Sequence, residues 1–132
     1  MVSYGYTLKN GYECIRNAAD NTGYIYFIQM DLIGPIKIGF SNNFKNRLVG
    51  LQTANPYPLN LLIAFPGNDQ MENHLHEKFR VYHIRGEWFH PDEDIIREIS
   101  AQKEINDRAG FSINDCLEGK PVDPKTRYYK AN

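Results

Sequence analysis

Four polar side chains that could carry chemistry lie among apolar neighbours in this sequence: Tyr26, Lys37, Arg47 and Glu72. A carboxylate can hold a divalent cation, which polarises a phosphoryl oxygen and can lower the pKa of a bound water. Arginine binds phosphate oxygens and offsets charge that develops in a transition state. Tyrosine or lysine can move a proton when neighbouring cations lower its pKa. These residue types suit phosphodiester hydrolysis, although any small domain carries an arginine and a glutamate near its surface.

The strands expected to position these side chains form a hairpin. The run 24–30 is dense in aromatic and β-branched residues and predicts a buried strand. The pattern resumes at 36–40, after turn residues that include Gly34 and Pro35. The short spacing favours an antiparallel hairpin, and Gly39 indicates a bend or a close backbone approach.

Helices and one more long strand follow the hairpin. Capping residues at 41–43 predict a helix that ends near Thr53, and the apolar run 59–65 predicts the strand. A second helix is expected over 70–82, and a third begins where Pro91 precedes several acidic residues. We therefore expect an α+β fold, with a small antiparallel sheet in a β-β-α-β-α core flanked by helices.

The candidate side chains on the helices fall beside the apolar stripes. Arg47 follows Phe44 by three residues, at the edge of the first stripe, and can reach across the rim of the sheet. Glu72 and His76 are four residues apart and share a flank next to the core face of the second helix.

The expected domain organisation has one core with extensions at both ends. Residues 1–22 form an N-terminal extension, in which alternation near the start predicts a short strand and 13–19 predict a helical turn or two. The core spans 23–90, a C-terminal helix spans 91–108, and an irregular tail covers 109–132.

The composition excludes several classes of protein. No apolar run reaches the length of a membrane span, and the Met1 end lacks the pattern of a signal peptide, so no membrane partner is expected. Cys14 and Cys116 fit neither a zinc spacing nor a disulfide framework. A reducing cytoplasm is therefore the expected location.

Charge is unevenly distributed along a chain whose net charge is −1. The segment 32–68 contains no acidic residue, and its three cations are Lys37, Lys45 and Arg47. These three predict a local face that binds nucleic acid, with ordinary scatter of surface charge as the alternative.

Several short motifs occur in a fixed order over residues 23 to 90. They are Gly23-Tyr24-Ile25-Tyr26, Lys37-Ile38-Gly39, Arg47-Leu48, Glu72, Leu75-His76-Glu77-Lys78-Phe79 and Gly86-Glu87-Trp88-Phe89. Each motif is weak alone, and their order is more specific. The ordered set resembles the GIY-YIG nuclease superfamily, and more narrowly its phage and bacterial branch, in which the second strand motif commonly reads Lys-Ile-Gly.

The resemblance implies a metal-dependent DNA endonuclease that acts in a bacterial or phage-infected host cell. By position, Glu72 would hold one divalent cation, Mg²⁺ or Mn²⁺, and Arg47 would contact the scissile phosphate. Tyr26 matches the tyrosine that organises or deprotonates the attacking water, and Gly39 matches the glycine of the second motif. Because few residues flank the core, sequence specificity for DNA is expected to be low or to come from a homodimer or a protein partner.

Lys37 departs from the best-described members of the superfamily, which have a tyrosine there. The lysine would act as a base only with a strongly lowered pKa. It would otherwise bind phosphate and leave the proton to Tyr26 or His76, and a third reading is that catalysis has been lost. The alternative function is therefore a non-catalytic nucleic-acid-binding or protein-interaction module on the same fold.

Each candidate also has a purely structural explanation. Tyr26 would be a core tyrosine with a satisfied hydroxyl, and Lys37 would extend from a sheet edge. Arg47 would form a structural ion pair with Glu72, and His76 would be a surface or capping histidine. The segment 87–89 is expected to close the core.

Overall fold

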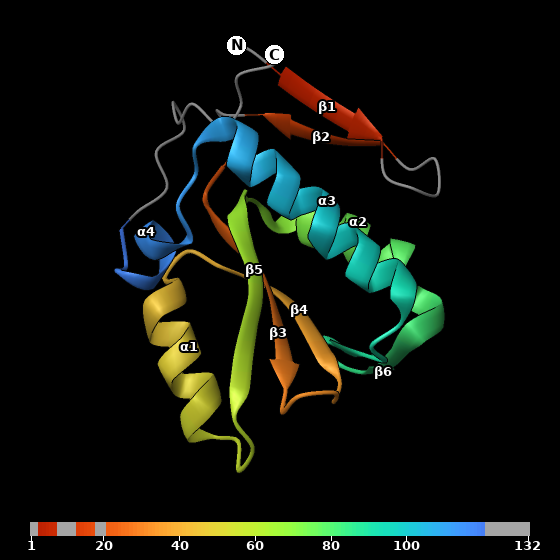
Figure 1. The fold of residues 1–132 in the computed structure, drawn as a ribbon, viewed down its shortest axis with the longest axis vertical. Helices are drawn as coiled ribbons and strands as arrows, with labels where there is room; N and C mark the ends of the chain where they lie inside the picture. Colours follow the sequence, from red (N-terminus) through yellow and green to blue (C-terminus); the bar gives the residue numbers. More distant parts are fainter. Residues whose placement is uncertain (1–2, 8–12, 18–20, 121–132) are drawn as a thin grey trace.

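The computed structural model describes residues 3–7, 13–17 and 21–120. Its main sheet contains five antiparallel strands in the order β5-β3-β4-β7-β6, and helices flank it (Figure 1), which confirms the predicted α+β fold. The strands are β3 (Gly23–Met30), β4 (Ile36–Ser41), β5 (Leu59–Gly67), β6 (His83–Arg85) and β7 (Trp88–Phe89). The helices are α1 (Phe44–Thr53), α2 (Asp69–Lys78), α3 (Glu93–Ala109) and α4 (Ile113–Leu117).

The N-terminal segment forms a separate hairpin. Strand β1 (Ser3–Thr7) pairs antiparallel with β2 (Glu13–Asn17), which confirms the short strand near the start. The expectation of helical turns over 13–19 was wrong for Glu13–Asn17, because cross-strand pairing with β1 takes the place of local helical bonds. Residues 18–20 of that prediction lie outside the described residues.

Helices cover both faces of the main sheet, and the side chains of β3 alternate between them. Ile25 and Phe27 pack in one cluster with residues of α2 and α3. Tyr24, Tyr26 and Ile28 pack in a second cluster with residues of α1 and α4. The sheet is therefore the middle layer between the two groups of helices (Figure 1).

Two helix boundaries differ from the sequence expectation. Helix α2 ends at Lys78, and a 3₁₀ turn at Arg80–Tyr82 replaces the rest of the helix predicted to reach residue 82. The irregular tail predicted over 109–132 was wrong at Ile113–Leu117, which form α4. Burial of Cys116 against the α1 side of the sheet stabilises this short helix. Residues 121–132 lie outside the described residues.

The hairpin of β3 and β4 places Tyr26 directly opposite Gly39. A Cβ atom added at Gly39 would collide with the outer end of the Tyr26 ring, including its hydroxyl. The ring, which is fully buried, therefore extends across β4 through the space that the missing side chain leaves. The close approach expected at Gly39 is confirmed.

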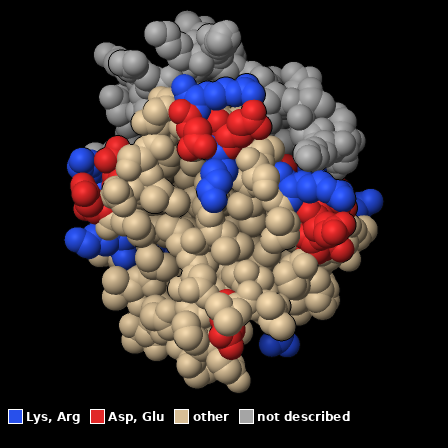
Figure 2. All heavy atoms as spheres, viewed as in Figure 1, with Lys and Arg blue, Asp and Glu red and all other residues tan. Residues whose placement is uncertain are grey.

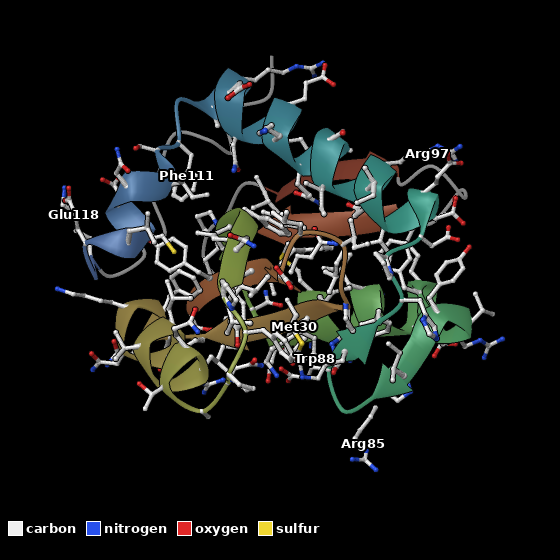
Figure 3. The ribbon with its side chains drawn as sticks, turned by 60° about the horizontal axis from the view of Figure 1, so that its bottom comes forward. Met30, Arg85, Trp88, Arg97, Phe111 and Glu118 are labelled. Carbon is white, nitrogen blue, oxygen red and sulfur yellow. The ribbon has the colours of Figure 1, made fainter. Side chains whose placement is uncertain are left out.

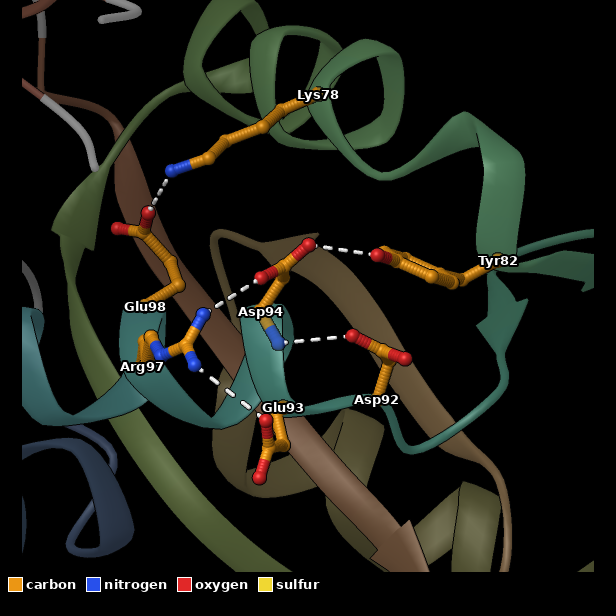
Figure 4. Close-up of polar contacts among 7 residues, drawn as sticks. All are labelled: Lys78, Tyr82, Asp92, Glu93, Asp94, Arg97 and Glu98. Atoms are coloured by element: carbon orange, nitrogen blue, oxygen red, sulfur yellow. Dashed lines mark hydrogen bonds and ion pairs between the residues drawn. The ribbon is translucent and has the colours of Figure 1, made fainter. Parts of the chain in front are cut away.

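Helices α2 and α3 are joined by polar contacts (Figure 4). The ammonium of Lys78 lies 2.7 Å from Oε1 of Glu98, and their side chains are only 5% and 1% exposed. Gln102 donates to the other oxygen of Glu98 at 2.8 Å, so this buried carboxylate is satisfied on both sides. At the near end of α3, the Tyr82 hydroxyl donates to Asp94.

Substituting Gly39→Ala should destabilise the protein by about 1 to 3 kcal/mol, because the new methyl group displaces a rigid buried ring. Gly50→Ala in α1 is the matched control, since a Cβ atom there meets nothing. That change should stabilise the protein by roughly 0.5 to 1 kcal/mol. Urea unfolding measures both, and a Gly39→Ala protein as stable as the parent would contradict the close approach.

Substituting Lys78→Met should cost about 3 to 5 kcal/mol of unfolding free energy, because it leaves Glu98 buried without its cation. Arg80→Ala removes an exposed pair with Glu77 on the same part of the chain and should cost less than about 1 kcal/mol. If both variants lost the same unfolding free energy in chemical denaturation, burial of the Lys78–Glu98 pair would make no extra contribution to stability.

Candidate active site

The candidate site lies where strand β4 runs on beyond its neighbour β7. Strand β7 pairs with β4 only at Ile36 and Lys37, so the later backbone groups on that edge need other partners. Side chains of α2 supply two of these partners. Nε2 of His76 lies 2.8 Å from the carbonyl oxygen of Ile38, and Glu72 accepts a hydrogen bond from the backbone N–H of Phe40. Helix α2 is thereby fixed along this edge.

His76 positions the helix that carries Glu72. Because a carbonyl oxygen only accepts, Nε2 of His76 carries the proton, and Nδ1 is the only ring nitrogen left with a lone pair. The ring also packs edge-on against Phe89, with centroids 5.0 Å apart. His76 is therefore neither a plain surface histidine nor a ligand through Nε2.

Glu87 enters the site from a tight turn between β6 and β7. Gly86 starts the turn with a φ of 56°, a conformation that glycine adopts without strain. The carbonyl of Glu87 accepts from the N–H of Ile38 at 3.0 Å, and its carboxylate lies 3.1 Å from the ammonium of Lys37. The sequence analysis placed Glu87 in the segment expected to close the core and did not assign it to the site, although Gly86 beside it is a turn signal.

Glu72 has an unusual carboxyl group. Its pKa is raised to about 7, mainly by burial and then by the neighbouring Glu87 carboxyl, while the bond from Phe40 and the charge of Lys37 oppose the shift. Oε2 of Glu72 is buried and has no hydrogen-bond partner. Two carboxyl groups this close favour a shared proton or a shared cation between them.

Tyr26 and Arg47 meet on the α1 side of the same edge. Nη1 of Arg47 donates to the Tyr26 hydroxyl at 3.5 Å. Burial is the main cause that raises the pKa of Tyr26, and the nearby Arg47 only partly offsets it. Tyr26 therefore keeps its proton at neutral pH. Arg47 is exposed and makes no ion pair within the described residues, so the alternative of a structural pair with Glu72 is not found there.

Lys37 is held as an ammonium beside two partners. Its side chain is 13% exposed, pairs with Glu87 and lies 5.5 Å from the ring centroid of Trp88. In Figure 3, Trp88 lies near the end of the sheet that is turned toward the viewer, and the side chain of Arg85 points away from the sheet. A paired ammonium has no lone pair with which to accept a proton.

The structure thus brings Tyr26, Lys37, Arg47 and Glu72 to one edge of β4. Lys45 lies elsewhere, since it is exposed and its methylene groups approach Gly119. On the side seen in Figure 2, clusters of basic and acidic residues adjoin one another around a largely uncharged centre, so charge there is mixed in sign.

The unpartnered oxygen of Glu72 fits a divalent cation. Mg²⁺ and Mn²⁺ prefer carboxylate oxygens and are commonly held by one or two of them together with water and phosphate oxygens. In the described part of the chain, no group of three or more His, Cys, Asp or Glu residues is arranged to hold a metal. The Glu72 carboxyl therefore suits these cations better than zinc.

Residues 23–104 match the model of the T5orf172 domain. This domain is found in phage and bacterial proteins and is often associated with nuclease-related folds. No curated protein and no solved structure matches the chain. None of the helices in the described residues combines the length and apolar character needed to cross a membrane.

Raising the pH from about 5 to about 8 should destabilise the parent protein relative to Glu72→Gln. The pKa of Glu72 rises from 4.5 to about 7 on folding. The stabilisation that this shift contributes is therefore fully present below the lower value and is lost as the pH rises through the higher one. We expect a relative change on the order of 1 to 2 kcal/mol, because solvent screens part of the effect.

Urea unfolding at both pH values measures this difference. Glu77→Gln changes an exposed carboxylate on the same helix and should follow the parent. If the difference in unfolding free energy between Glu72→Gln and the parent stayed constant across the pH range, Glu72 would titrate as an ordinary surface carboxyl.

Proposed function

The chain belongs to the T5orf172 domain family, and we propose that it is a metal-dependent DNA endonuclease of the GIY-YIG type. The observation that carries the proposal is the meeting of Glu72, Arg47 and Lys37 at one edge of β4. Glu72 contributes a buried oxygen without a partner, Arg47 an exposed guanidinium outside any described ion pair, and Lys37 an ammonium. These groups match the requirements of phosphodiester hydrolysis.

Glu72 would hold the divalent cation through its unpartnered oxygen. When bound, Mg²⁺ or Mn²⁺ supplies Lewis-acid polarisation of a phosphoryl oxygen and lowers the pKa of a bound water. The bond from the Phe40 N–H and the anchoring of α2 by His76 fix this carboxyl before substrate arrives.

Arg47 and Lys37 would bind the phosphate. Arg47 is exposed, and its guanidinium can contact the scissile phosphate and stabilise the charge of the transition state. Lys37 is paired as an ammonium, which supports phosphate binding rather than a role as base. The lysine at the position of the motif tyrosine is therefore compatible with hydrolysis.

Tyr26 would position Arg47, whose guanidinium donates to its hydroxyl. Because Tyr26 is fully buried, it is a positioning residue and does not touch the attacking water. Because burial keeps Tyr26 neutral, it does not act as the base. In this set, the basic oxygens belong to Glu72 and Glu87. The pKa of about 7 describes the Glu72 carboxyl before a cation binds, so it does not by itself assign the base.

The second candidate function is a non-catalytic nucleic-acid-binding or protein-interaction module. Two observations favour this module. Tyr26 is fully buried, and Lys37 is paired with Glu87. Structural contacts therefore hold two side chains that hydrolysis of the GIY-YIG type would use. Cleavage separates the two functions, since binding alone fits both.

Purified protein should nick or linearise supercoiled plasmid in Mn²⁺ or Mg²⁺. Glu72→Ala and Arg47→Ala should each slow cleavage by about 10²-fold or more, because they remove the cation ligand and the phosphate contact. Agarose gel electrophoresis measures cleavage, and a gel-shift assay in EDTA should show that Glu72→Ala still binds DNA.

Glu77→Gln should cut like the parent, since its carboxylate is exposed on α2 away from these contacts. A parent that binds plasmid and leaves it intact across divalent metals and pH values would establish the binding module instead. If Glu72→Ala cut as fast as the parent, a different site or a contaminating nuclease would be responsible.

A further inference from the structure

We propose that Glu87 is a second carboxylate of the cation site and the residue that holds Lys37 until the cation binds. The inference rests on the proposed function and deepens it. When Glu72 and Glu87 hold a divalent cation together, Lys37 is released to a phosphate. Cation and nucleic acid should then bind cooperatively.

The place of Glu87 is set by backbone contacts and does not depend on its ion pair. Gly86 and Glu87 form the turn between β6 and β7, and the Ile38 N–H donates to the Glu87 carbonyl at 3.0 Å. On the other side, Nε2 of His83 lies 2.8 Å from the Gly86 carbonyl oxygen. The Glu87 carboxylate therefore remains beside β4 when its pair with Lys37 opens.

The Glu87 side chain lies between groups of opposite charge. Oε1 of Glu87 is 3.1 Å from the Lys37 ammonium. On the other side is the Glu72 carboxyl, close enough for the two to share a proton, with Oε2 of Glu72 buried and unpartnered. A carboxyl pair with one unpartnered oxygen fits a hard divalent cation, which commonly takes two carboxylates.

The local charge count explains why the cation should come before the phosphate. Lys37 and Arg47 carry two positive charges, and ionised Glu72 and Glu87 carry two negative charges. A phosphate that enters this neutral group must displace Glu87 from Lys37. A divalent cation satisfies both carboxylates and leaves the two basic side chains to the phosphate.

A purely structural ion pair is the alternative account of Lys37 and Glu87. Their side chains are 13% and 34% exposed, and a pair of this kind contributes at most about 1 kcal/mol of stability. Such a pair predicts no effect of Glu87 on cation affinity and no dependence of nucleic-acid affinity on the cation.

The test measures Mn²⁺ binding to the full chain by electron paramagnetic resonance, and binding of a labelled DNA duplex by fluorescence anisotropy in Ca²⁺ or EDTA. Glu87→Gln should weaken Mn²⁺ binding by about tenfold. It should also tighten DNA binding in EDTA and remove the increase in affinity that Ca²⁺ gives the parent. Glu77→Gln should match the parent in both measurements.

Lys37→Met provides a second variant with an opposite expected sign. It should bind Mn²⁺ at least as tightly as the parent, because a competing cation is removed, and should lose the Ca²⁺-dependent gain in DNA affinity. Lys37→Met tests the inference if Glu87→Gln does not fold. A general loss of structure would weaken Mn²⁺ binding, whereas the inference predicts binding at least as tight as that of the parent.

Parent-like Mn²⁺ affinity in Glu87→Gln overturns the inference, as does a parent protein that does not bind Mn²⁺. A parent that binds Mn²⁺ through Glu87 and yet leaves plasmid intact would remove the nuclease function and keep the second carboxylate. The two failures are therefore distinguishable.

Discussion

The candidate site depends on the absence of a side chain at Gly39. The Tyr26 ring crosses β4 through that space, so its hydroxyl reaches the edge where Arg47 donates to it. The register that pairs Tyr26 with Gly39 also pairs Lys37 with Ile28. A slip of one residue would move Lys37 to the other face of the sheet and separate it from Glu87.

The same edge explains how residues from both faces of the sheet come together. Strand β7 is too short to cover β4, and side chains of α2 complete the hydrogen bonding in its place. Because Glu72 bonds the edge backbone through one part of its carboxyl, it is held rigidly with Oε2 still unpartnered. Stability and the proposed chemistry thus use the same carboxyl group, whose pKa is raised mainly by burial and by the neighbouring Glu87 carboxyl.

Sequence periodicity and turn chemistry were sufficient to predict the hairpin, the main helices and the close approach at Gly39. They failed where long-range contacts decide the outcome. Glu13–Asn17 form a strand because β1 pairs with them, and α4 forms because Cys116 finds an apolar surface. Glu87 was not assigned to the site because its flanking strands are too short to show a period, and its position depends on contacts with β4. The alternative of a structural Arg47–Glu72 pair is not found in the described residues, where Arg47 donates to the Tyr26 hydroxyl instead.

The central claim is that the carboxyl of Glu72 holds a divalent cation beside Lys37 and Arg47. Crystals soaked in Mn²⁺ and measured near the manganese absorption edge test it directly, because anomalous scattering locates the ion without reference to activity. The account predicts one anomalous peak about 2.0 to 2.3 Å from Oε2 of Glu72. Manganese bound only at other carboxylates, with Oε2 of Glu72 still unpartnered, would contradict it.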